Sequence, residues 1–207
     1  MLAAARANGK VIMTAHTQRY YPYNQKIKEI IDSKELGEFV MGHAMWVKPL
    51  NPDRRPPWML VQDQGGGMGY MDATHLIDRL IWLLGPDIYS VSGITGNFCF
   101  PEIDADDTGM HFLRWESGRV ATISIMAFRT GATESGGDYY FTNGQARTRQ
   151  GIENGVWIGR DGKWNEIEVG SQQDSLLREF GDFVKALERG DPDTPIPMEH
   201  GRHVLQV

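Results

Sequence analysis

A glycine-rich stretch followed by polar residues at helical spacing offers the clearest chemistry in the sequence. Residues 65–78 read GGGMGYMDATHLID, and Asp72, His75 and Arg79 follow one another at intervals of three and four residues. On a helix, such intervals place side chains on one face. An imidazole there can exchange a proton near neutral pH, and a neighbouring carboxylate can orient it. We therefore take His75 as a candidate proton-transfer residue, Asp72 as its orienting partner and Arg79 as a candidate substrate contact.

The same three side chains are also compatible with a structural role. Asp72 would stabilise a helix simply by lying near its N-terminus, where the backbone dipole favours negative charge. Paired polar groups are only a statistical indicator of a site. From these residues alone, a polar helix face and a catalytic pair both stay open.

Aromatic and basic side chains flank an irregular segment that precedes the histidine. Residues 48–67 hold four of the ten prolines and three consecutive glycines, and long irregular loops in compact domains are often functional. The side chains that could stack on a sugar or hydrogen-bond to it are Trp46, Trp58, Arg54 and Arg55. Core packing of Trp46 and solvent exposure of the arginines are equally compatible with the sequence.

No metal site or activated nucleophile is predicted. The three histidines His16, His43 and His111 show no ligand spacing to one another, so buried or surface histidines are the default interpretation. The acidic run at 104–107 lacks the repeated ligands and closing glutamate of a calcium loop. Cys99, the single cysteine, can form no intrachain disulfide and has no evident base partner.

Charge and hydropathy narrow the class of protein. The chain has 207 residues and a formal net charge of −6, with its basic residues scattered along the sequence. Binding to nucleic acid or to anionic membranes is therefore disfavoured. No segment approaches the roughly 20 apolar residues that span a bilayer. Together with the lone cysteine, this favours a soluble protein of the reducing cytoplasm.

The elements expected around these residues are helices first and strands later. Helices are predicted at 3–7, 22–36, 70–84 and 175–189, with another beginning near 200. Strands are predicted at 10–15, 38–47, 88–100, 109–115, 119–128 and 138–142, and around residues 157 and 167. Turn signals between several strands indicate hairpins and hence antiparallel pairing. The expected fold class is α+β, a large, mostly antiparallel open sheet with helices packed on one face.

The beginning of the chain has a different pattern from the rest. Residues 1–16 combine an alanine-rich helix with an apolar strand, like the last unit of a parallel α/β sheet whose earlier strands are absent. We expect 1–16 to be the remnant of such a sheet. Residues 17–207 are expected to form the α+β domain, truncated at its C-terminus because 200–207 end within a helical pattern.

Four segments, in order, resemble one family of oxidoreductases. The first segment resembles the signature of the glucose-fructose oxidoreductase, inositol dehydrogenase and rhizopine-catabolism (Gfo/Idh/MocA) family. It consists of GGG at 65–67, His75 eight residues after the last glycine of that triplet, and then LID and WLLG. The other matching segments are RYYP at 19–22, LGEF at 36–39 and PW at 57–58.

The resemblance implies a two-domain enzyme that transfers hydride between NAD or NADP and a sugar, cyclitol or related polyol. Residues 1–16 would then be the end of its nucleotide-binding Rossmann domain, and the sheet would form a homodimer or homotetramer. His75 corresponds to the family's catalytic histidine, and Arg19 to a position near both cofactor and substrate. Trp46, Trp58 and Arg79 are the further expected substrate contacts. A non-catalytic ligand-binding or oligomerisation module is the alternative.

Two departures from the family pattern matter. The family's aspartate, four residues before the histidine, falls on Met71, and Asp72 lies one place later, about 100° further round a helix. In addition, the chain has no GxGxxG after a strand and no Glu-Lys-Pro segment with its lysine. We therefore expect this chain alone to bind NAD or NADP poorly and to be inactive.

Overall fold

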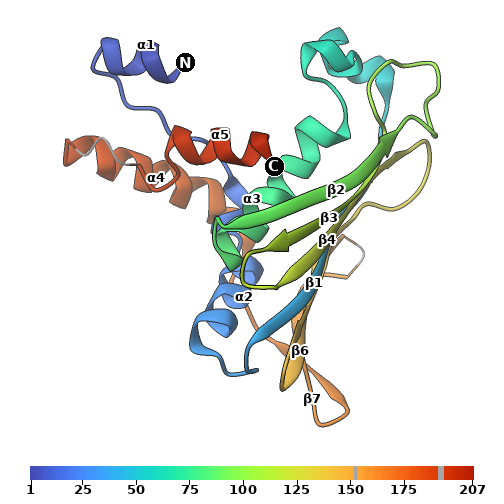
Figure 1. Ribbon diagram of the computed structural model, residues 1–207, viewed down its shortest axis with the longest axis vertical. Coiled ribbons are helices and arrows are strands. Elements are labelled where there is room, and N and C mark those ends of the chain that lie inside the picture. The colour runs from blue at the N-terminus through green and yellow to red at the C-terminus, as the bar shows by residue number, and fades with distance from the viewer. Residues whose placement is uncertain (152, 191–193) are drawn as a thin grey trace.

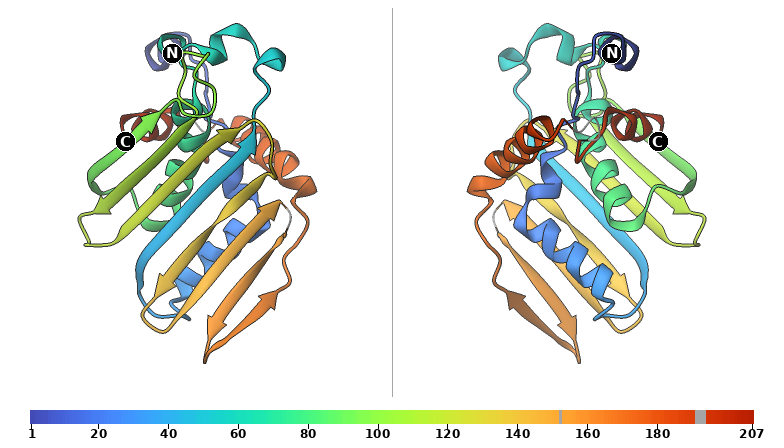
Figure 2. Two further views of the ribbon diagram at one scale, coloured as in Figure 1. Left: turned by 90° about the vertical axis from the view of Figure 1, so that its right-hand side faces the viewer. Right: turned by 90° about the vertical axis from the view of Figure 1, so that its left-hand side faces the viewer.

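The expected α+β architecture is confirmed in the computed structural model, which describes residues 1–151, 153–190 and 194–207. One open sheet of eight strands runs in the order β2-β3-β4-β1-β5-β6-β7-β8. The helices lie on one face of this sheet and leave the other face uncovered (Figures 1 and 2).

The sheet is built from two antiparallel meanders joined by its first strand. Its strands are β1 Phe39–Pro49, β2 Ile88–Gly96, β3 Thr108–Trp115, β4 Val120–Phe128, β5 Glu134–Phe141, β6 Gly144–Gly151, β7 Gly155–Arg160 and β8 Lys163–Ile167. Strand β1 pairs parallel with β4 and antiparallel with β5, and the other described pairs are all antiparallel. Strand β1 therefore lies near the middle of the sheet.

Five α-helices accompany the sheet in the described part of the chain. They are α1 Leu2–Ala7, α2 Pro22–Ser33, α3 Thr74–Leu84, α4 Ser175–Glu188 and α5 Met198–Gln206. The core lies between the sheet and helices α2 and α3, where Ile27, Leu76 and Ile123 are fully buried. No helix among the described residues has the length and apolar character needed to cross a membrane.

Several predicted boundaries differ from the structure. The strand expected at 10–15 is reduced to a single bridge between Met13 and Pro197, because no strand among the described residues offers this segment a ladder. Helix α2 ends at Ser33, since Lys34 adopts a left-handed conformation with φ of 55°. Strand β6 was not predicted, because its arginines make it resemble a loop.

Strand β6 is stabilised across the sheet by charge. Arg147 lies directly opposite Asp138 of β5, and its Nε donates to that carboxylate over 2.9 Å. Arg149 binds the same carboxylate through Nη2, also at 2.9 Å. Cross-strand pairs of opposite charge favour pairing, which explains a strand with little apolar pattern.

Candidate active site

The helix that carries His75 begins with a π-helical turn, Gly69–Ala73, before α3 proper. Gly67 has a φ of +98°, and a Cβ on it would lie 2.2 Å from Oδ1 of Asp106. The backbone N–H of Gly69 donates to Oδ2 of the same aspartate over 2.8 Å. Asp106 thus holds the start of the helix, and close packing requires glycine at position 67.

The glycines consequently serve internal packing and do not form a dinucleotide site. A Cβ on Gly66 would lie 2.4 Å from the backbone oxygen of Met59, and Gly67 packs on Asp106. The preceding residues form 3₁₀ turns, Pro57–Leu60 and Gln62–Gln64, where a dinucleotide fingerprint requires a strand. The described residues at this place therefore do not fit a nicotinamide dinucleotide.

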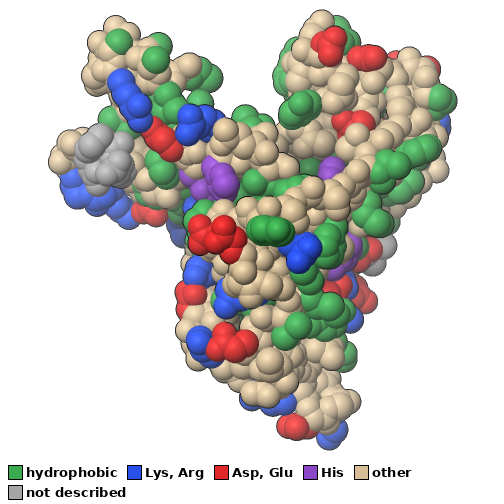
Figure 3. All heavy atoms as spheres, in the orientation of Figure 1, with side chains coloured by type: hydrophobic (Ala, Val, Ile, Leu, Met, Phe, Trp, Pro, Cys, Tyr) green, Lys and Arg blue, Asp and Glu red, His purple; other side chains and the backbone are tan. Residues whose placement is uncertain are grey.

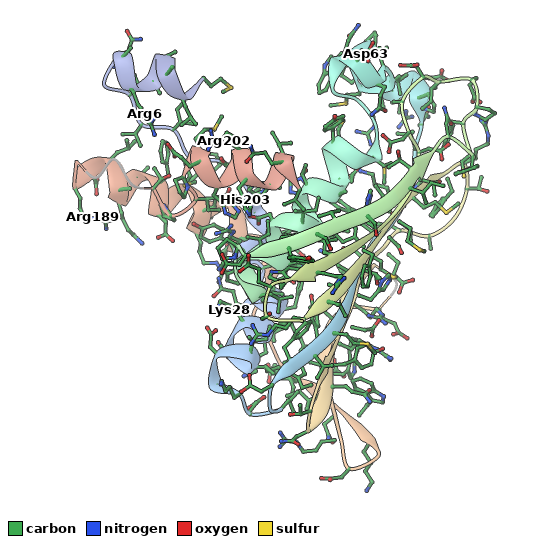
Figure 4. All side chains as sticks on the ribbon, in the orientation of Figure 1. Arg6, Lys28, Asp63, Arg189, Arg202 and His203 are labelled. Atoms are coloured by element: carbon green, nitrogen blue, oxygen red, sulfur yellow. The ribbon has the colours of Figure 1, made fainter. Side chains whose placement is uncertain are left out.

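A cavity of about 200 Å³ opens beside His75. Its walls come from the end of β1, the turns that follow it, the start of the helix and the loop before β3. The turn segment after β1 can be found in Figure 4 by the label of Asp63, which belongs to it. The lining residues are Lys48, Leu50, Arg55, Met59, Leu60, Gly67, Met68, Met71, Asp72, His75, Ile103, Ala105 and Asp106. Apolar walls with a few convergent polar groups are typical of small-molecule sites.

Lys48 was not predicted as a site residue, yet it is central to this cavity. Its Nζ lies 2.5 Å from Oδ1 of Asp72 and 4.7 Å from the ring centroid of Trp46. The ring of Trp46 is in turn 5.8 Å from that of His75. Alternate residues of a strand share a face, so the spacing of Trp46 and Lys48 was the signal that could have found this lysine.

Asp72 acts on His75 differently from the expectation. Its carboxylate is engaged by Lys48, and the described contacts include no hydrogen bond between Asp72 and His75. Burial lowers the pKa of His75, while the charges of Asp72 and Asp78 oppose that shift through space. The imidazole is therefore neutral at pH 7, which is the form that accepts a proton. The side chain of Met71, at the usual position of the family's aspartate, also lines the cavity.

Arg19 does not line this cavity, and its expected contacts with substrate and cofactor stay predictions. Its Nη2 lies 2.6 Å from Oδ1 of Asp78, and its Nε binds both oxygens of that carboxylate. Nε2 of His200, from α5, lies 2.6 Å from the same Oδ1. Burial alone would raise the pKa of Asp78, but the hydrogen bonds from His200 and Arg19 outweigh it and lower the pKa.

Of the remaining predicted contact residues, some lie at the cavity and others do not. Arg79 is fully buried, and its Nη2 donates to the backbone oxygen of Gly136 over 2.7 Å, so it belongs to the core and not to the cavity. Trp46 borders the site through His75 and Lys48. Trp58 is 43% exposed and lies outside the cavity wall, whereas Arg55 is part of that wall.

Comparison with known proteins places this geometry in a family. Residues 24–147 match the GFO/IDH/MocA C-terminal domain, and this segment is more than half of the chain. The chain belongs to the Gfo/Idh/MocA family.

A curated relative of this family member is the uncharacterised oxidoreductase YrbE of Bacillus subtilis (strain 168). It is 28% identical over 126 residues, which are 59% of this chain and 35% of the relative. The chain thus matches about a third of that protein's length.

Solved structures share the fold at low sequence identity. The aldose-aldose oxidoreductase of Caulobacter crescentus, complexed with glycerol, has a TM-score of 0.83 at 14% identity, with 99% of this chain and 62% of that chain covered. The WlbA dehydrogenase of Bordetella pertussis, in complex with NADH and UDP-GlcNAcA, has a TM-score of 0.77 at 22% identity, with 99% and 60% covered.

Proposed function

We propose that this chain is the substrate-binding part of an NAD- or NADP-dependent oxidoreductase that acts on a sugar, cyclitol or related polyol. The observation that carries the proposal is the position of His75, which follows the glycines on α3 and lines a cavity with the Lys48–Asp72 pair. The names of the related proteins, which include a dehydrogenase with bound NADH and an oxidoreductase with bound glycerol, support the class of reaction and substrate.

In such a reaction, this chain would transfer the proton of the substrate hydroxyl. A neutral His75 can accept the hydroxyl proton when an alcohol is oxidised and return it in the reverse reaction. Lys48 has three N–H donors, and Asp72 occupies one of them, so the others are available to a substrate oxygen. The apolar wall, with Met59, Met68 and Ile103, would exclude water from the reacting carbon.

The nicotinamide cofactor would be bound by residues outside this chain. Solved relatives are longer, since the chain covers 60–62% of the two described above. Residues 1–16, which hold helix α1 and the single bridge at Met13, are proposed to be the end of the Rossmann domain that holds the cofactor, and residues 17–207 the substrate-binding domain. The complete protein, and not this chain alone, is the proposed enzyme.

The uncovered face of the sheet is proposed to join copies of the protein into a homodimer or homotetramer. Exposed apolar side chains lie on this face, among them Ile94 at 67%, Met110 at 59% and Phe112 at 39% exposure. In the space-filling view, hydrophobic side chains gather along the sheet side of the molecule (Figure 3). A contiguous exposed apolar surface is typical of an interface.

The test is turnover by the complete protein. Purified protein is incubated with NAD⁺ or NADP⁺ and a panel of sugars, cyclitols and polyols, and reduced nicotinamide is followed by its absorbance. With an accepted substrate, His75→Ala should lower kcat by roughly 10²- to 10⁴-fold. The matched control is His43→Ala, because the Nδ1 of His43 contacts Thr122 on the sheet, away from the cavity. An undiminished rate for His75→Ala would favour a non-catalytic binding or oligomerisation module.

A further inference from the structure

The cavity beside His75 has more hydrogen-bond donors available to a ligand than acceptors. Four ionisable side chains besides the histidine line it, namely Lys48, Arg55, Asp72 and Asp106. Their formal charges cancel. Their hydrogen bonds do not balance in the same way, because both carboxylates are bound by donors of this chain and one of the two cations is not paired.

The two carboxylates are directed towards the protein. Oδ1 of Asp72 lies 2.5 Å from Nζ of Lys48, and only 8% of the aspartate side chain is exposed. Oδ2 of Asp106 accepts the backbone N–H of Gly69 over 2.8 Å, and its Oδ1 fills the space that a Cβ on Gly67 would need. The negative charges of the wall are therefore buried and already hydrogen-bonded.

Arg55 differs from these groups because it has no such partner. Among the described residues, its guanidinium makes no hydrogen bond and no ion pair, and the residue is exposed while it also lines the cavity. Its backbone is extended, with φ of −103° and ψ of 143°, and the following Pro56 disfavours a helical conformation there. The adjacent Arg54 is exposed as well but does not line the cavity.

The chemistry of the available donors indicates what the cavity would bind. An ammonium has three N–H donors and a guanidinium five, and Asp72 occupies one donor of Lys48. A hydroxyl group brings a donor together with its acceptors, whereas an ionised carboxylate or a phosphate brings acceptors and negative charge. The mainly apolar wall, with Met59 and Ile103, strengthens such a charge-assisted hydrogen bond. An oxyanion therefore fits these donors better than a neutral group does.

We propose that Arg55 is a specificity-determining residue that binds an anionic group of the substrate, either a carboxylate or a phosphate. The substrate is then an acidic or phosphorylated sugar or polyol, with its anion at Arg55 and its reacting hydroxyl at His75. The planar guanidinium can bind either kind of oxyanion through two parallel hydrogen bonds. That the ligand is a sugar or polyol rests on the proposed function, but anion binding at Arg55 can be measured without any turnover.

The experiment is calorimetric titration of the full chain with ligands that differ in one group. The probes are D-glucose, D-glucuronate and D-glucose 6-phosphate, together with D-galactose, D-galacturonate, myo-inositol and myo-inositol 1-phosphate. At low salt, an anionic ligand should bind at least about tenfold more tightly than its neutral counterpart, and added salt should reduce this difference. Comparison of the acid with the phosphate identifies which oxyanion is preferred.

Variants at two neighbouring positions separate the cavity from general surface charge. Arg55→Ala should weaken binding of the anionic ligand by roughly 10- to 100-fold and leave binding of the neutral sugar unchanged. Arg55→Lys keeps the charge but not the planar fork, so it should recover only part of the affinity. Arg54→Ala is the matched control, since it removes the same charge from the same loop outside the cavity wall, and both affinities should stay as in the wild type.

Three results would overturn the inference: equal affinity for neutral and anionic ligands, no binding of any anionic probe, or equal losses of affinity in Arg54→Ala and Arg55→Ala. These failures differ from failure of the proposed function. Turnover of a neutral polyol by the complete protein that depends on His75 but not on Arg55 would reject the anion site and keep the oxidoreductase. Arg55-dependent binding of an anionic probe without any turnover would do the reverse.

Discussion

Nζ of Lys48 lies 2.5 Å from Oδ1 of Asp72, and this contact joins the end of β1 to the turn that begins the His75 helix. Only 21% of the lysine side chain and 8% of the aspartate side chain are exposed. The pair thus connects the centre of the sheet to the candidate active site, and it sets both the charge and the shape of one wall of the cavity.

Breaking this pair should destabilise the fold. Lys48→Met leaves the Asp72 carboxylate buried without its partner, and we expect the free energy of unfolding to fall by about 3 kcal/mol in urea denaturation. Lys48→Met combined with Asp72→Asn should recover part of that loss. Lys26→Met is the matched control, since the Lys26–Glu29 pair is exposed and should contribute less than about 1 kcal/mol. Equal losses of stability for Lys48→Met and Lys26→Met would show that the buried pair stabilises the fold no more than the exposed one.

Gly67 should tolerate no side chain. Gly67→Ala places a methyl group against the Asp106 carboxylate in a backbone conformation with positive φ, so we expect a loss of about 3 kcal/mol in thermal unfolding. Gly65→Ala is the control, because Gly65 also has a positive φ, of +86°, but nothing lies within 4 Å of a Cβ there. Gly65→Ala should lose only the free energy of placing a Cβ at positive φ, about 1 kcal/mol. If both variants have the same melting temperature, the close packing on Asp106 is not limiting.

Asp107 should hold the loop between β2 and β3. Its fully buried carboxylate accepts the backbone N–H groups of Phe98, Cys99 and Phe100, at 2.6–3.0 Å. Asp107→Ala leaves these donors unpaired, and we expect about 3 kcal/mol of destabilisation with faster hydrogen exchange at the three amides. Asp104→Ala removes one contact, from the N–H of Gln62, and should cost less. Unchanged exchange at 98–100 in Asp107→Ala would contradict this assignment.

Acid should destabilise the protein through His16. The pKa of His16 is about 4 in the fold and about 6.5 in the unfolded chain, so between these values the unfolded state binds the proton more readily. Above pH ~6.5 the ring is neutral in both states and the free energy of unfolding is at its full value. As the pH falls towards 4, the free energy of unfolding decreases by about 3 kcal/mol in total. Urea denaturation across this range should show the loss in the wild type and a flatter profile in His16→Phe. Parallel profiles would rule out His16 as the cause.

The sequence predicted the individual helices and strands better than the contacts between them. Helix α3 was recognisable because its apolar residues repeat with helical periodicity and Gly85 ends it, and the glycines before His75 were recognisable from their composition alone. Lys48 could have been found from its spacing to Trp46 on the predicted strand, but the contact of His200 with Asp78 could not, since α5 is distant in sequence from α3. The burial of Arg79 could not be predicted either, because helical spacing gives the direction of a side chain but not whether the core or a cavity lies there.

The position of β1 has a consequence for how the site is assembled. Met41 pairs with Val120 on one side and with Tyr140 on the other, so the first strand of the chain acquires both neighbours only after β4 and β5 have been made. Pairings between such distant residues close slowly during folding. Trp46 and Lys48 belong to this strand, so we expect the sheet to fix both side chains beside the His75 helix only after residues 120–141 have been made.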